Sequence, residues 1–160
     1  MDPDRRPIAT GGELTYISVM KLDADDALQR LAGQDHAILG TTHPVRGADA
    51  VPCVFALDED GYVGIPIDLV KPKSTMKLQR ETNLQADPRA TLMVHHWDAD
   101  DWSKLWWVRA EMVWQGSDLH ERTDSLAGLL ESRYVQYAGR PFHRVIVYRI
   151  VNVIGWSGER

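Results

Sequence analysis

One basic stretch contains the residues whose types and spacing most suggest chemistry. Between residues 71 and 89 five cations outnumber two carboxylates, in a chain whose net charge is −5. The stretch begins Lys71-Pro72-Lys73-Ser74-Thr75, at the point where the composition changes from strand to helix. Two ammonium groups, two hydroxyls and the free N–H groups of a helix N-terminus could converge there on one phosphate. The pattern predicts an anion site, although a solvated helix face with ordinary surface lysines explains the spacing equally well.

Other kinds of catalytic site find little support in the sequence. His95 and His96 are adjacent, and adjacent strand residues point to opposite faces, so the two imidazoles are poorly placed to share one metal ion. Cys53 lies in an apolar run and is expected to be a small core residue. No serine stands in an elbow motif with a partnered histidine. We therefore predict no metal site and assign no catalytic residue.

The composition describes one soluble domain of 160 residues, 44% hydrophobic and 26% charged. The acidic balance argues against a broad nucleic-acid-binding face. A single cysteine, Cys53, excludes an internal disulfide and favours a reducing compartment. We find no signal peptide and no stretch approaching the roughly 18 apolar residues that a membrane span requires. These observations predict a cytoplasmic protein without a nucleic-acid or membrane partner.

Hydrophobic patterning predicts a domain over residues 13–160, preceded by a flexible tail over residues 1–12. Hairpin connections such as Asp58-Glu59-Asp60-Gly61 indicate an antiparallel sheet, and six short strands with apolar residues on both faces favour a closed barrel. The expected helices begin near Asp23, Ser74 and Ser117, and the expected strands cover residues 36–42, 50–57, 62–67, 90–94, 105–114 and 143–151.

Tryptophan is the unusual residue type, with six Trp against two Phe. Five of the six lie between residues 97 and 114, and three of these fall in the strand expected over 105–114. Alternation places Trp106 and Trp114 on an entirely apolar face, whereas Trp107 shares the other face with Arg109 and Glu111. The first face is expected to be core, and the second to meet a polar surface.

Four runs along the chain resemble one family. They are Lys71-Pro72-Lys73-Ser74-Thr75, Asn83-Leu84-Gln85-Ala86-Asp87-Pro88-Arg89, Asp101-Trp102-Ser103-Lys104-Leu105-Trp106-Trp107-Val108-Arg109 and Gly155-Trp156-Ser157. The family they resemble is that of the pyridoxamine 5'-phosphate oxidase-like split-barrel proteins, in its actinobacterial branch of coenzyme F420-dependent enzymes. The resemblance covers about residues 24 to 157.

The resemblance implies a six-stranded antiparallel split β-barrel of the FMN-binding type, which forms a homodimer with the cofactor in grooves at the subunit interface. It implies that Lys71, Lys73, Ser74 and Thr75 hold the cofactor phosphate, that Lys77 and Arg80 lie near its anionic tail, and that Val54, Ile65 and Ile67 lie near its ring. Trp107 and Arg109 become candidates for the groove because their face would meet the partner or the cofactor.

The implied function is an F420-dependent oxidoreductase, which transfers a hydride between the deazaflavin and a small conjugated organic acceptor. A missing catalytic motif is consistent with chemistry that belongs to a bound cofactor. The alternatives are an FMN-binding flavoprotein of the same fold and a cofactor-binding protein without turnover. Lys77 and Arg80 favour the polyanionic F420 tail, because FMN needs only the phosphate clamp.

Overall fold

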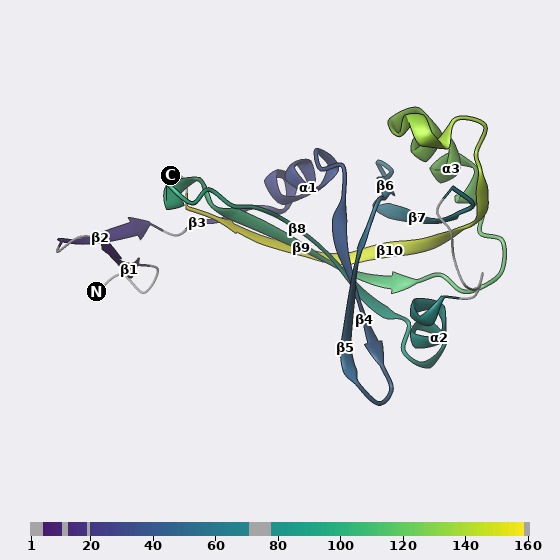
Figure 1. Cartoon of the computed structure of the whole chain (residues 1–160), viewed down its shortest axis with the longest axis horizontal. Helices are drawn as coiled ribbons and strands as arrows, with labels where there is room; N and C mark the ends of the chain where they lie inside the picture. The colour runs from purple at the N-terminus through teal and green to yellow at the C-terminus, as the bar shows by residue number, and fades with distance from the viewer. Residues whose placement is uncertain (1–4, 11–12, 19, 71–77, 159–160) are drawn as a thin grey trace.

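A mainly antiparallel β-sheet with three α-helices forms the chain (Figure 1). The structure is a computed structural model and describes residues 5–10, 13–18, 20–70 and 78–158. Its strands are β1 (Arg5–Thr10), β2 (Glu13–Ser18), β3 (Met20–Lys21), β4 (Ala37–His43), β5 (Gly47–Cys53), β6 (Ala56–Leu57), β7 (Tyr62–Asp68), β8 (Arg89–His96), β9 (Trp106–Trp114) and β10 (Phe142–Ser157). Its α-helices are α1 (Ala24–Ala32), α2 (Gln79–Ala86) and α3 (Thr123–Arg133), and two short 3-10 helices cover Trp102–Lys104 and Val135–Tyr137.

The main sheet has the strand order β5-β4-β8-β9-β10-β7-β6, and β3 pairs with the end of β10. Strand β10 is long enough to pair with β7 over its first half and with β9 over its second half, with a bulge between Ile150 and Asn152. Among the described residues no ladder joins β5 to β6, so the sheet stays open there. The predicted antiparallel, mainly β architecture is confirmed.

The predicted count of six strands and the predicted closure were wrong. Strands β3 and β6 have only two residues each, which is too short for an alternating pattern to reveal. The chain breaks its pairing after Cys53, where the hydroxyl of Tyr134 donates a hydrogen bond to the carbonyl oxygen of Phe55 at 3.0 Å. A tertiary contact of this kind leaves no periodic signal in the sequence.

The core lies on the inner face of this curved sheet. The alternation predicted for β9 is confirmed, because Val108 and Ala110 are fully buried and Met112 is 1% exposed, whereas the residues between them are half-buried. Helix α1 adds Ala27 and Leu31 to this core. Other members of the core are Leu39, Phe55, Val63, Ile65, Ile67, Leu84, Leu92 and Tyr148.

Helix α3 packs on the outer face of β7 and β10. A Cβ atom at Gly64 would lie 2.9 Å from the Cβ atom of Leu126, so only glycine allows this close approach. The sequence predicted that the helix begins at Ser117, whereas it begins at Thr123. The cause is a turn, in which Gly116 has φ +97° and the amide of Arg122 donates to Nδ1 of His120 at 3.1 Å.

Strands β1 and β2 pair with each other as a separate two-stranded hairpin, which Figure 1 shows beyond the end of the main sheet. The hairpin crosses the expected boundary between residues 12 and 13, because Arg5–Thr10 forms a strand where a tail was expected. In the described part of the chain, no helix is both long and apolar enough to cross a membrane.

Candidate functional site

The predicted phosphate ligands Lys71, Lys73, Ser74, Thr75 and Lys77 all lie outside the described residues. In sequence they belong to the connection between β7 and α2. At its far end, the carboxylate of Glu81 accepts a hydrogen bond from the Leu78 amide at 2.9 Å, which begins α2.

Arg80, in the first turn of α2, is the predicted tail-binding residue that the structure describes. The Nε atom of its half-buried guanidinium is buried and has no hydrogen-bond partner among the described residues. Leaving a buried donor unpaired is costly, and a charged donor more so. Arg80 therefore presents a donor that a phosphate or carboxylate oxygen could satisfy.

Two buried tyrosines lie close to Arg80. Burial raises the pKa of Tyr148 far above its ordinary value, and the positive charge of Arg80 partly opposes this rise. Burial also raises the pKa of Tyr137, whose hydroxyl donates to Oδ2 of the buried Asp68 at 3.0 Å. The hydroxyl of Tyr148, in contrast, is buried without a partner in the described part of the chain. The charge of Arg80 thus acts on two buried tyrosines, one paired with Asp68 and one without a described partner.

The residues expected near the cofactor ring have two different environments. Ile65 and Ile67 on β7 are 1% and 0% exposed and point into the core of the sheet. Val54 is half-buried and packs on the opposite side of β7, against the cluster that includes Ala56 and Tyr137. Within a single chain, therefore, Val54 lies near Tyr137, whereas the two isoleucines form part of the core.

Trp107 and Arg109 lie on the outer face of β9, half-buried. The ring of Trp107 lies 6.5 Å from the ring of Trp156 on β10. The guanidinium of Arg109 pairs with Glu111 at 3.3 Å, and its Nε atom is buried without a hydrogen-bond partner in the described part of the chain. Both described arginines that the sequence proposed for the site thus have an unsatisfied buried donor.

The structure places these two arginines in separate regions. Tyr148, beside Arg80, pairs with Trp114 in the sheet, and Trp114 stands five residues from Arg109 along β9. At about 3.3 Å per residue, the backbone positions of Trp114 and Arg109 lie roughly 16 Å apart along β9. Arg80 on α2 and Arg109 on the outer face of β9 are thus carried by different elements of the sheet and its helices.

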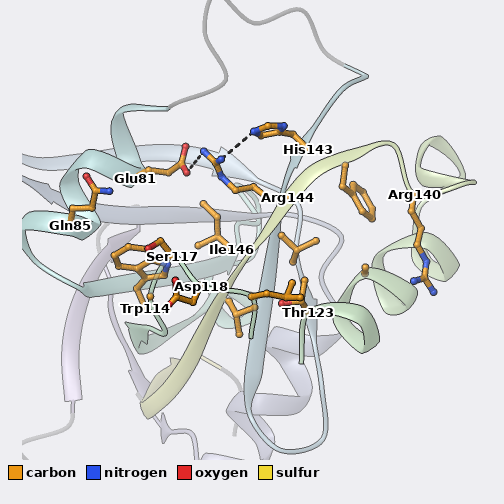
Figure 2. A pocket seen from close by; sticks show the side chains of 16 residues that line it. Glu81, Gln85, Trp114, Ser117, Asp118, Thr123, Arg140, His143, Arg144 and Ile146 are labelled. Atoms are coloured by element: carbon orange, nitrogen blue, oxygen red, sulfur yellow. Dashed lines mark hydrogen bonds and ion pairs between the residues drawn. The ribbon is translucent and has the colours of Figure 1, made fainter. Parts of the chain in front are cut away.

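A cleft that the sequence did not predict lies between α2, β10 and α3, with a volume of about 800 Å³ (Figure 2). Near its α2 side, Arg144 forms an ion pair with Glu81, and its guanidinium lies 3.1 Å from Nε2 of His143. The described lining includes none of the site residues proposed from the sequence. It joins residues from three distant segments, and no local motif could have revealed it.

Comparison with known proteins supports the fold. No protein-family model matches the sequence, and no curated protein matches it significantly. Among solved structures, a FAD-binding protein from Mesorhizobium loti is 16% identical, with a TM-score of 0.62 over 86% of this chain and 95% of its own. A protein from Corynebacterium glutamicum, named as a candidate pyridoxamine 5'-phosphate oxidase, is 15% identical, with a TM-score of 0.53 over 86% and 96%.

A haem storage protein from Vibrio cholerae is also similar, at 10% identity and a TM-score of 0.57, over 81% of this chain and 92% of its own. At such identities the likeness is one of fold. The chain therefore has a fold like that of the pyridoxamine 5'-phosphate oxidase-like split-barrel proteins, as the sequence predicted. Solved structures of this kind include flavin-binding and haem-binding proteins.

Proposed function

We propose that the protein is an oxidoreductase that uses a flavin-type cofactor, coenzyme F420 in the first instance and FMN as the alternative. The observation that carries the proposal is Arg80, a predicted anion ligand whose buried Nε has no partner among the described residues. It stands directly after the basic segment that begins at Lys71. A flavin-binding neighbour of the same fold supports the cofactor class.

The chain's own residues fit such a group. Arg80 and the lysines before it supply positive charge for a phosphate, and the first turn of a helix favours a bound anion. Val54 and the aromatic cluster around Tyr137 supply apolar surface. When bound, a deazaflavin or flavin supplies the hydride chemistry, so the protein need only bind, orient and exclude water. This division of tasks agrees with a sequence that has no nucleophile motif.

A homodimer is part of the proposal. The outer face of β4, β8 and β9 exposes Ile38 and Met93, at 36% and 37%, and these residues adjoin Arg109 in the sheet. A second copy packed on this face would cover the two apolar side chains. It could also bring Trp107 and Arg109 of one protomer to the Arg80 region of its partner. Light scattering should give twice the chain mass, and Met93→Glu should give the monomer mass.

Titration of the purified protein tests the cofactor proposal. F420 and FMN are each added while tryptophan fluorescence is followed, with haem as a third arm because a haem storage protein has the same fold. Saturable quenching by F420 supports the first form of the proposal, and saturation by FMN alone supports its alternative. Saturation by haem alone, or by none of the three, contradicts both.

Hydride transfer is tested separately from binding. Reduced F420 or FMN is mixed with the protein and a panel of conjugated acceptors, and cofactor oxidation is followed by absorbance. Tight binding without any turnover would indicate that the protein binds the cofactor but is not an oxidoreductase. The double variant Lys71→Ala with Lys73→Ala should weaken binding and make it less dependent on salt, because two phosphate-binding cations are lost.

A further inference from the structure

The cleft between α2, β10 and α3 has an apolar floor (Figure 2). Trp114 packs partly against the core while also lining the cleft, so its ring joins the two. The other apolar side chains of the floor are Ala127, Phe142, Val145, Ile146 and Val147. A cleft of about 800 Å³ lies in the range of small-molecule sites, which are mostly apolar with a few placed polar groups.

The positive charges of the lining are already paired within the protein. Arg144 forms an ion pair with Glu81, and this pair neutralises the charge near α2. Arg140 forms ion pairs with Asp124 at 2.7 Å and Glu131 at 2.8 Å. Neither guanidinium is therefore available to a ligand without losing an existing partner.

Asp118 is the charged lining residue without an ion-pair or hydrogen-bond partner in the part of the chain that the structure describes. It lies with Trp114 and Ser117 at the end of the cleft opposite Arg140 (Figure 2). The loop that carries it is joined to β10 at its start, where the Gln115 amide donates to the Val147 carbonyl at 2.9 Å, and it ends in a turn in which the Thr123 amide donates to the His120 carbonyl at 3.0 Å.

We infer that this cleft binds a small organic cation with an apolar or aromatic body. The cationic group lies near the Asp118 carboxylate and the Trp114 ring, where both the charge and the π-face attract it. The body rests on the valine and phenylalanine side chains of β10. An anion would meet two arginines that are already paired and the repelling carboxylate of Asp118. This site goes beyond the proposed cofactor function, because the described lining contains none of the proposed cofactor residues.

Nuclear magnetic resonance with benzyltrimethylammonium as the probe and phenylacetate as the matched anion tests the inference without any cofactor. The indole N–H signal of Trp114, assigned with a Trp114→Phe variant, should shift with the cation and saturate at millimolar concentrations, as expected for a ligand of this size. Asp118→Asn should weaken cation binding about threefold or more. The control Asp100→Asn removes another exposed carboxylate, outside the cleft, and should leave binding unchanged.

Each result decides the matter. Saturable binding of the cation that Asp118→Asn weakens supports the inference. Preferential binding of phenylacetate, equal cation binding by the wild type and Asp118→Asn, or no shift of the Trp114 signal up to the highest soluble probe concentration overturns it. The spectrum of each variant also reports whether it is folded, so a loss of binding through unfolding is recognised directly.

Discussion

Removing the hydroxyl group from Tyr148 and from Tyr137 should have opposite effects on the stability of the protein. The Tyr148 side chain is fully buried, and its hydroxyl has no hydrogen-bond partner among the described residues. Tyr148→Phe removes an unsatisfied group whose burial costs about 1–3 kcal/mol. The void left by one oxygen offsets part of this gain. We therefore expect the free energy of unfolding to rise by about 1 kcal/mol.

Tyr137→Phe should have the opposite effect. The Tyr137 hydroxyl donates to the buried carboxylate of Asp68 at 3.0 Å, and a hydrogen bond to a charged group contributes about 1.5–3 kcal/mol. Its loss should lower the free energy of unfolding by that amount. The two variants should therefore differ by about 3 kcal/mol, although both delete one oxygen from a tyrosine.

Urea unfolding followed by tryptophan fluorescence measures both variants against the wild type. If the slope with urea is unchanged, a shift in the midpoint reports a change in stability alone. The reasoning is refuted if Tyr148→Phe destabilises the protein by 1 kcal/mol or more, because the hydroxyl must then have a partner in solution. It is equally refuted if Tyr137→Phe has no effect.

Two further predictions concern packing and a surface charge. Gly64→Ala should destabilise the protein by about 1–3 kcal/mol, because the new Cβ would lie 2.9 Å from the Cβ of Leu126. The control Gly40→Ala, whose new Cβ would have its nearest contact at 3.6 Å, should change the thermal midpoint little. Equal effects of the two variants would contradict this packing. The Asp87 carboxyl should titrate with a pKa of about 2, because Arg89 donates hydrogen bonds to it. Since its folded pKa is lowered, its stabilising contribution is present above pH about 4 and is lost towards pH 2. Carboxyl-carbon NMR checks this value, and an unchanged titration in Arg89→Ala would count against the stated cause.

Local patterns in the sequence predicted the features that depend on local chemistry. Asp23 begins α1 by accepting a hydrogen bond from the Asp26 amide at 2.8 Å. The turn before β7 forms because Asp58 accepts the amides of Asp60 and Tyr62 and Gly61 takes φ +82°. Alternation along β9 separated core from surface because each inward residue meets the same buried environment.

Features that depend on distant segments were missed. Arg122, just before α3, forms ion pairs with Asp58 and Asp60, more than sixty residues away in sequence, and no local pattern predicts these contacts. The cleft is lined by residues of α2, β10 and α3, so no residue spacing within one segment of the sequence predicts it. The composition of the basic segment predicted an anion site, a prediction that stays open, whereas the unpaired Nε of Arg80 depends on the packing of α2 and has no signal in the sequence.

The central claim is that Arg80 anchors the anionic part of a flavin-type cofactor, and its replacement tests this claim most directly. The dissociation constant for F420 and for FMN is measured by calorimetry for the wild type, Arg80→Met and Arg89→Met. Arg89 is the control because it lies at the other end of the same basic stretch and is paired with Asp87. A charged hydrogen bond of about 1.5–3 kcal/mol predicts that Arg80→Met weakens binding roughly 10- to 150-fold, while Arg89→Met leaves it unchanged. Equal affinity of folded Arg80→Met and the wild type would contradict the claim.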